Sequence, residues 1–403
     1  MVNFGRTKPV VALIALAAAT SASPALAQAT GDVQDLISDL YGGNGITLPN
    51  PGHFAHFAAD SQAELQNLSN IVASNVGAIT IGSSVGSITF DFEQGVPVRS
   101  QESLGPLIAD RASTIGAGKL SVGLSYTNVV FKQLNGTSLN SLELTLHHEQ
   151  TAAHPPYEED VIHLDIDLHL KQEVLAFSAA YGVTNNLDVG VVVPLVKVNG
   201  RAHAVATIIP GPNTGTPSPH YFVNPLTGQA VSPISDTRAS ATGIGDVLLR
   251  AKWNANPDAS TPVKFAIVAQ ASLATGDSKD LLGTGSTSLF AAGIVSASLG
   301  VFNPHLNLGY EYFIDQKNKS INDRSNIRAA LGYDIKAGSN FAIANDFLFR
   351  RENDGSTFYD VAVGAKWAPI EKLPISFNFV LPVNRNSGLR PNYYFTFGIE
   401  SSF

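Results

Sequence analysis

Hydrophobic and polar residues alternate along most of the chain from residue 119 onward. The clearest stretch is VIHLDIDLHLK, residues 161–171, in which an aliphatic residue takes every second position. Successive side chains of a β-strand point to opposite faces, so this spacing predicts a strand with one apolar and one polar face. The polar face is too charged for a hydrophobic core, so we expect it to meet water. It carries His163, Asp165, Asp167, His169 and Lys171.

The same alternation recurs in a series of stretches and predicts twelve strands. They cover residues 119–131, 160–182, 187–198, 243–253, 263–275, 286–299, 304–315, 324–336, 340–350, 357–367, 374–384 and 392–403. Short connections alternate with mostly longer ones, an arrangement typical of outer-membrane barrels. We therefore expect an all-β protein, a transmembrane antiparallel up-and-down β-barrel of about 12 strands.

Residues 139–150 alternate as well and leave a second strand count open. We expect them to project from the first long loop without spanning the membrane. If they do span, together with part of residues 200–210, the barrel has 14 strands.

The region before residue 119 has a different pattern and is expected to form two further units. Residues 1–27 combine basic residues, an apolar run and an A-x-A pattern at 25–27, which predicts a cleaved signal peptide. Residues 28–118 form a plug-like or periplasmic segment, ahead of the barrel at 119–403. Within that segment we expect helices at 32–41 and 59–74, and a β-hairpin at 78–92.

A membrane explains why so many charged residues share strands with apolar ones. In hydrocarbon every backbone polar group must be paired, which leaves helices and closed barrels as spanning structures. Polar residues then face the lumen and apolar residues face lipid. Besides the five residues of 161–171, the predicted lumen residues are Asp246, Arg250, Lys252, Val268, Phe290, Arg328, Asp346, Arg350, Asp360 and Lys366.

Aromatic residues at the strand ends fit the same arrangement. Trp253 and Trp367 each follow Ala-Lys near the end of a predicted strand, where a membrane-interface girdle is expected. The last strand alternates up to Phe403. Outer-membrane barrels commonly end this way, so we expect Phe403 to act as a signal for the barrel-assembly machinery.

Composition narrows the function classes. Lys and Arg number 25 against 33 Asp and Glu, a formal net charge of −8, and this becomes −10 when residues 1–27, with two basic residues, are removed (23 against 33). Nucleic acid is therefore not an expected partner. The chain contains no cysteine, which excludes disulfides and thiolate chemistry. No cofactor is expected.

Two motifs invite a chemical interpretation, and both have a simpler one. Gly82-Ser83-Ser84-Val85-Gly86 matches the nucleophile pattern G-x-S-x-G, but a strand follows where a hydrolase elbow needs a helix. Histidines at 147, 148, 154, 163 and 169 suggest a metal site, yet His163 and His169 are about 20 Å apart along one strand. We expect neither a catalytic residue nor a metal ligand.

Several stretches resemble the outer-membrane proteins grouped under the meta-pathway of phenol degradation. The resemblance lies in SLGPLIADRASTIG (residues 103–116), AYGVTNNLDVG (180–190) and GIGDV (243–247), and it covers about residues 80–403. It implies a transporter of aromatic or other hydrophobic compounds, distantly similar to fatty-acid uptake channels, with no catalytic motif.

The sequence therefore predicts an outer-membrane channel of a Gram-negative bacterium that takes up small hydrophobic or aromatic compounds passively. Its partners would be that solute, membrane lipid and the assembly machinery. Two alternatives stay open, an outer-membrane hydrolase that uses Ser84, and a structural barrel without transport.

Overall fold

The computed structural model describes residues 31–50, 52–76, 91–93, 96–98, 109–148, 159–212, 220–258, 260–314, 323–338, 340–370 and 373–403. The predicted signal peptide and the Ser84 motif lie outside these ranges. Among the described residues, no helix is both long and apolar enough to cross a membrane.

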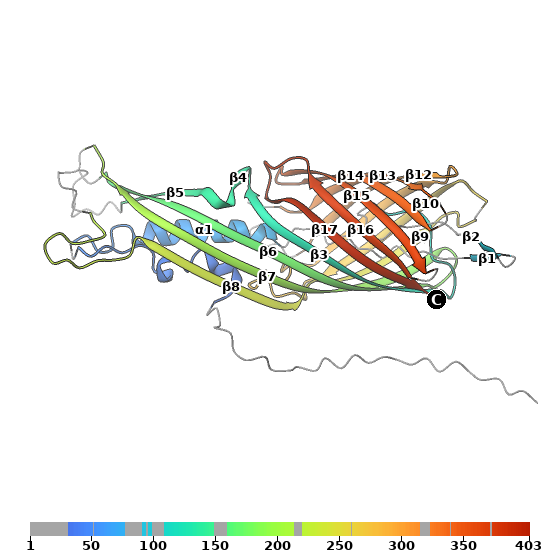
Figure 1. Cartoon of the computed structure of the whole chain (residues 1–403), viewed down its shortest axis with the longest axis horizontal. Coiled ribbons are helices and arrows are strands. Elements are labelled where there is room, and N and C mark those ends of the chain that lie inside the picture. Colours follow the sequence, from blue (N-terminus) through green and yellow to red (C-terminus); the bar gives the residue numbers. More distant parts are fainter. Residues whose placement is uncertain are drawn as a thin grey trace, which may run out of the picture.

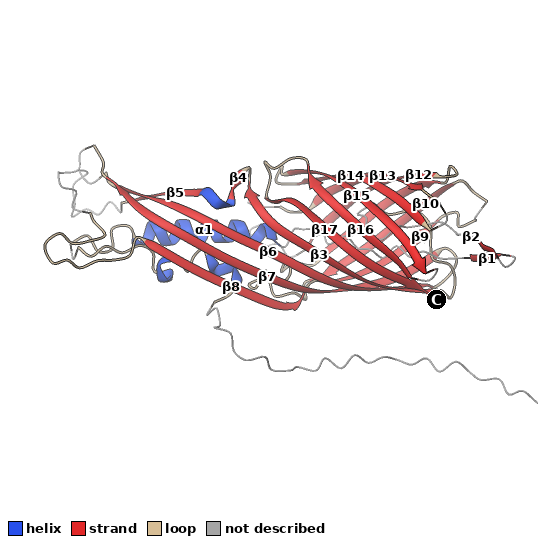
Figure 2. Cartoon of the chain, viewed as in Figure 1, coloured by secondary structure: helices blue, strands red, loops and turns tan. Residues whose placement is uncertain are grey.

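The chain forms a closed antiparallel barrel of twelve strands, which confirms the predicted fold and strand count (Figures 1 and 2). Its strands are β3 (Leu120–Leu134), β6 (Val161–Gly182), β7 (Leu187–Ile209), β8 (Ile234–Ile244), β9 (Val247–Asn254), β10 (Val263–Leu273), β11 (Ser288–Ala297), β12 (Phe302–Phe313), β13 (Asn326–Lys336), β14 (Phe341–Glu352), β15 (Thr357–Ile370), β16 (Leu373–Pro382) and β17 (Leu389–Ser402). β3 pairs with both β17 and β6, which closes the barrel. β8 and β9 pair with successive parts of β7 and so count as one interrupted strand.

Two strands run well past the rest of the barrel. β6 has 22 residues and β7 has 23. The N-terminal half of β6, called its upper half, pairs with β5 (Leu142–His147), which does not continue through the barrel. The C-terminal half of β7, called its upper half, pairs with β8. We call these upper halves of β6 and β7, with β5 and β8, the extension; it occupies the left of Figure 1.

The sequence missed part of this extension. Residues 139–148, the described part of the 139–150 stretch, project from the first long loop as expected, with β4 (Thr137–Ser138), η3 (Leu139–Ser141) and β5. By contrast, residues 200–209 continue β7, and residues 234–242 of β8 lie outside the predicted strands.

Short helices and one long helix fill the inside of the extension. The expected helix at 32–41 is instead two 3-10 helices, η1 (Val33–Leu36) and η2 (Leu40–Gly43). Tyr41 adopts φ 60°, so no α-helix continues past it into α1. The second expected helix is present as α1 (Ala58–Val76). The hairpin expected at 78–92 lies largely outside the described residues, and the structure has a short antiparallel pair, β1 (Asp91–Glu93) and β2 (Val96–Val98).

Apolar packing holds α1 and η1 in the extension. Leu65, Leu68 and Val72 of α1 belong to one hydrophobic cluster with the inner-face aliphatic residues of β6 and with Leu36 of η1. Close approach matters at one point: a Cβ added to Gly200 of β7 would lie 2.6 Å from Leu36 Cδ2. Glycine at this position lets η1 lie directly on the sheet.

The facing of β6 contradicts part of the sequence interpretation. The aliphatic residues at even positions 162–170 are buried under α1 and η1. The polar residues between them therefore lie on the outer face of the extension. The predicted lumen position is wrong for His163, Asp165, Asp167, His169 and Lys171. The expectation that they meet water is satisfied on the outside, since all five are at least partly exposed.

Candidate functional site

The lumen of the barrel is the candidate site, and the other predicted lumen residues lie on its side of the wall. Along β10, for example, Ala266 and Val268 are buried while Phe265 and Ile267 are exposed on the opposite face. Nine of the residues lie on the inner faces of β9, β10, β11, β13, β14 and β15: Arg250, Lys252, Val268, Phe290, Arg328, Asp346, Arg350, Asp360 and Lys366. Asp246 sits between β8 and β9 and accepts hydrogen bonds from the N–H and hydroxyl of Thr284, each 2.7 Å long.

The predicted girdle and assembly residues lie on the outside. Trp253 and Trp367 are 47% and 51% exposed on the outer faces of β9 and β15. Phe403 is 71% exposed, and its N–H donates to the Leu120 carbonyl at 2.8 Å. A role of Phe403 in assembly stays a prediction.

Residues 109–118, here called the lumen segment, run inside the barrel near the end where the C-terminus lies. The segment starts as Ala109-Asp110-Arg111-Ala112, and its two charged residues form ion pairs with the wall. Asp110 pairs with Arg250, and at 3.6 Å with Lys252, both on β9. Arg111 pairs with Asp334 on β13. Charges that would be costly to bury alone thus have opposite partners across the lumen.

Hydrogen bonds and apolar contacts fix the same segment to the wall. Asn307 on β12 donates from Nδ2 to the Asp110 carbonyl at 2.7 Å. The Ala112 N–H donates to Ser296 Oγ at 2.8 Å, and the Ile115 N–H donates to Asp188 at 2.9 Å. Ala112, fully buried, packs with Ala266, Val268 and Ile294. These contacts fix the segment in place at this end of the lumen.

A cavity of about 150 Å³ lies deeper in the lumen, where the barrel meets the end of α1. Its aliphatic lining consists of Val76 of α1 with Val192, Pro194, Leu248 and Leu282. The lining also includes Phe290, Phe313 and three arginines, Arg324, Arg328 and Arg350, and most of its residues are polar or charged. The cavity therefore offers both an apolar surface and a cationic, aromatic one.

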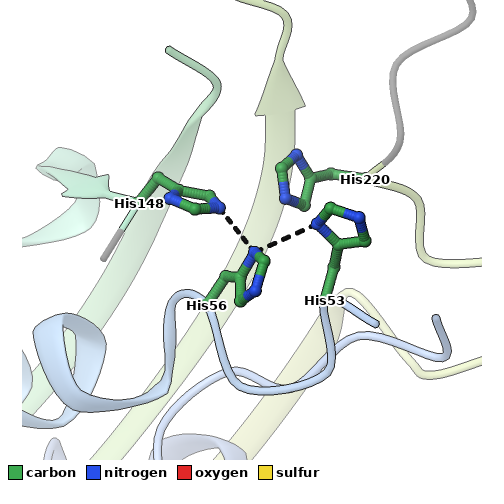
Figure 3. Close-up of side chains that lie close together, drawn as sticks. All are labelled: His53, His56, His148 and His220. Carbon is green, nitrogen blue, oxygen red and sulfur yellow. Dashed lines mark hydrogen bonds between the residues drawn. The ribbon is translucent and has the colours of Figure 1, made fainter. Parts of the chain in front are cut away.

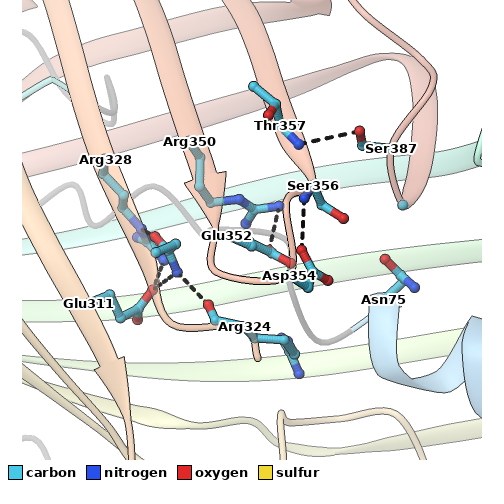
Figure 4. A network of polar contacts seen from close by, with 12 residues as sticks. Asn75, Glu311, Arg324, Arg328, Arg350, Glu352, Asp354, Ser356, Thr357 and Ser387 are labelled. Carbon is cyan, nitrogen blue, oxygen red and sulfur yellow. Dashed lines mark hydrogen bonds and ion pairs between the residues drawn. The ribbon is translucent and has the colours of Figure 1, made fainter. Parts of the chain in front are cut away.

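Acids hold Arg328 and Arg350 in place, as Figure 4 shows, and aromatic rings lie against both guanidinium groups. Arg328 pairs with Glu311, which also accepts from Ser288 Oγ at 2.8 Å and Asn326 Nδ2 at 3.1 Å. The Arg328 guanidinium lies 5.6 Å from the centre of the Phe290 ring. Flat guanidinium groups and rings arranged in this way form surfaces on which another aromatic ring can stack.

Arg350 is held in a similar manner. It pairs with Glu352 at 3.5 Å, and its guanidinium lies 4.0 Å from the centre of the Phe358 ring. Acids on the wall compensate the arginines, so the cavity has no large excess of one charge sign.

The sequence left open whether residues 28–118 plug the lumen, and it did not single out Asp110 and Arg111 of the lumen segment. Asp110 and Arg111 stand between apolar residues in SLGPLIADRASTIG, and a charged pair within an otherwise apolar stretch was the available signal. It also missed Arg324 and Glu352 as site residues, because the alternation assigns a residue to a face without giving its height in the lumen.

No family model matches the chain, and neither does any curated protein. The predicted membership in the phenol meta-pathway group stays a prediction. Among solved structures, an outer membrane channel from Pseudomonas putida F1 is similar with a TM-score of 0.43 and 11% identity, over 72% of this chain and 98% of that chain. The toluene transporter TbuX of Ralstonia pickettii gives 0.36 and 13%, over 72% and 90%. The strand pairings, and not these likenesses, establish the barrel.

Proposed function

We propose that the chain is an outer-membrane channel for the passive uptake of small hydrophobic or aromatic compounds. The observation that carries this proposal is the cavity of about 150 Å³ in the lumen, whose lining combines aliphatic residues, two phenylalanines and fixed polar and charged groups. Apolar surface together with precisely placed polar groups is what orients a small molecule in a binding site. The proposal includes no catalytic step and no cofactor.

The outer surface of the barrel supports a position in the membrane. Large apolar residues such as Phe265, Ile267, Leu331 and Phe377 are about half exposed on the outer faces of their strands. A closed barrel satisfies its backbone hydrogen bonds internally, so such a surface is stable in hydrocarbon and unfavourable in water. Export by a signal peptide at residues 1–27 and residence in a Gram-negative outer membrane belong to the same proposal.

Residues 109–118 lie in the lumen, so a solute that crosses the barrel has to pass them. We include this segment in the proposal as a plug that is held by ion pairs and hydrogen bonds and that has to shift before a solute can leave the cavity. The plug role of the wider region 28–118 is likewise part of the proposal.

Uptake measurements test the function directly. A strain lacking the gene, complemented with the wild-type chain, is compared for the entry of radiolabelled toluene, benzoate and an aliphatic acid. We expect complementation to raise the initial rate for at least one aromatic probe. Unchanged rates across the whole panel would contradict transport.

A pair of phenylalanine variants connects the rate to the cavity. Phe290→Ala removes a ring from the cavity wall, and we expect it to change the rate for aromatic probes several-fold. Phe265→Ala removes a ring from the lipid-facing side of the neighbouring strand and is the matched control, with little expected change. Equal effects of both variants would mean that the cavity is not on the path.

A further inference from the structure

Four histidines from three distant parts of the chain meet inside the extension (Figure 3). His53 and His56 belong to the turn that leads into α1, His148 follows β5, and His220 precedes β8. The first two are three residues apart in the motif His53-Phe-Ala-His56. The cluster lies at the start of α1, whereas the lumen cavity lies at the other end of this helix. The cluster takes no part in the proposed transport.

The ring nitrogens converge on one point. One ligand nitrogen from each of the four residues lies within 4.8 Å of those of the other three. His53 Nδ1 and His56 Nδ1 are 3.0 Å apart, and His148 Nε2 and His56 Nδ1 are 2.5 Å apart. Four nitrogens bound to a tetrahedral zinc ion at about 2.05 Å are about 3.3 Å apart. This distance lies between the shortest separation in the cluster, 2.5 Å, and the 4.8 Å within which all four nitrogens fall.

Hydrogen bonding among the imidazoles alone accounts poorly for this arrangement. A ring nitrogen carries either one proton or one lone pair, directed along a single line in the ring plane. His56 Nδ1 nevertheless faces nitrogens of both His53 and His148. A cation at the centre of the cluster accepts a lone pair from each ring at once and removes this competition.

One ligand is already oriented by an acid. Asp160 accepts a hydrogen bond from His220 Nδ1 at 2.8 Å, and both side chains are fully buried. A carboxylate only accepts, so Nδ1 carries the proton and Nε2 of His220 carries the lone pair. The Gly211 N–H donates to the same carboxylate at 2.8 Å and holds it in position. A carboxylate behind a ligating histidine is the usual second layer of a zinc site.

We propose that His53, His56, His148 and His220 bind one divalent transition-metal ion of the zinc class. Neutral imidazoles suit zinc, copper and nickel, whereas calcium and magnesium require oxygen ligands. Four protein ligands with no position left for water define a structural site rather than a catalytic one. The ion cross-links the turn before α1 to the end of β5 and to the segment before β8, and so fastens the N-terminal region to the extension.

Metal analysis of the full-length chain in detergent tests the site. The protein is stripped with chelator, dialysed against ZnCl2 at micromolar free zinc, and analysed for metal content and thermal stability. We expect one zinc per chain and an increase in Tm on binding. Cobalt substituted for zinc should give the visible absorption spectrum of a tetrahedral site. Absence of stoichiometric zinc, or an equal response to CaCl2, would overturn the proposal.

Variants separate this site from adventitious binding. His56→Ala changes a half-buried turn residue and should lower zinc affinity at least 100-fold and abolish the Tm increase. Asp160→Asn should weaken binding about 10- to 100-fold, as expected for the partner of a ligating histidine. His203→Ala, in an exposed histidine–aspartate pair on the outside of β7, is the matched control and should bind like wild type. Zinc content that persists in His56→Ala would refute the assignment.

Discussion

The barrel and the extension are made from the same strands but have opposite polarity. In the lower half of β6, Phe177 and Tyr181 face outward, and the wall of the lumen is rich in polar groups. In the upper half, Leu164 and Leu168 face inward and polar residues face outward. The alternation continues without a change of phase along the strand. Its environment changes: in the proposed membrane location the barrel has lipid outside and a polar lumen inside, whereas the extension has water outside and a packed helix inside.

The change occurs at one level across neighbouring strands. Asn128 of β3 pairs with Glu173 of β6, which pairs with Lys197 of β7, which pairs with Thr242 of β8. Just below this row, Leu175, Leu195 and Ile244 occupy the corresponding outer positions. A row of polar residues directly above a row of apolar ones marks the expected upper limit of the hydrocarbon.

Ion pairs hold the lumen segment in the barrel, whereas apolar packing holds α1 and η1 in the extension. The largest expected effect comes from breaking the ion pairs of the lumen segment. Asp110→Asn removes the carboxylate that pairs with Arg250 and Lys252, and removing one member of a buried pair costs about 3–5 kcal/mol. We expect amide exchange at Ala112 to accelerate about 100- to 4,000-fold, since each 1.4 kcal/mol is a factor of ten.

Hydrogen-exchange mass spectrometry measures this effect, with Asp258→Asn in an exposed turn as the control. The lumen segment should also contribute to flux, so the same variant should raise the uptake of probe solutes. Exchange at Ala112 that is unchanged in Asp110→Asn would show that the ion pairs do not hold the segment.

Apolar packing is the corresponding force in the extension. Leu168→Ala empties a site that is 1% exposed, and the expected loss in stability of the extension is about 2–5 kcal/mol. His169→Ala, the next residue on the outer face, should change stability by less than about 0.5 kcal/mol. Limited proteolysis of β5 and β8 reports the difference. Equal sensitivity of the two variants would show that the facing of β6 is reversed.

Much of the barrel could be predicted from sequence because alternation is a local property. Strands such as 263–275 and 324–336 carry their own two-faced pattern, and the lipid side follows from it. The extension could not be predicted in the same way. The faces of residues 161–171 depend on whether α1 lies inside, which is a contact between residues about 100 positions apart. The histidine cluster is likewise invisible in sequence apart from His53-Phe-Ala-His56.

Lipid exposure of β17 gives the next prediction. Phe397 is 41% exposed on the outer face, whereas Gly398 is buried on the inner face. Phe397→Lys places a cation against hydrocarbon, at a cost of about 2–4 kcal/mol near the midplane and less near an interface. Gly398→Lys places the same charge on the lumen side, and we expect it to assemble better. Heat-modifiable gel mobility measures assembly, and equal mobility shifts would contradict the assigned faces.

The smallest expected effect concerns acid on the outer face of the extension. Asp236 Oδ1 on β8 lies 3.1 Å from His203 Nδ1 and 3.4 Å from Arg201 Nη2. The hydrogen bond with His203, and to a lesser degree the one with Arg201, lowers the pKa of the Asp236 carboxyl. A lowered folded-state pKa adds stability that is present above the unfolded value of about 3.9 and is lost as the pH falls through the folded value. Asp236→Asn should therefore reduce the Tm of the extension slightly at pH 6 and not at all at pH 2. Because the pair is exposed, high salt should shrink the difference at pH 6 as well. A Tm difference that is as large at pH 2 as at pH 6 would mean that the variant acts through packing, and that charge contributes nothing to this outer face.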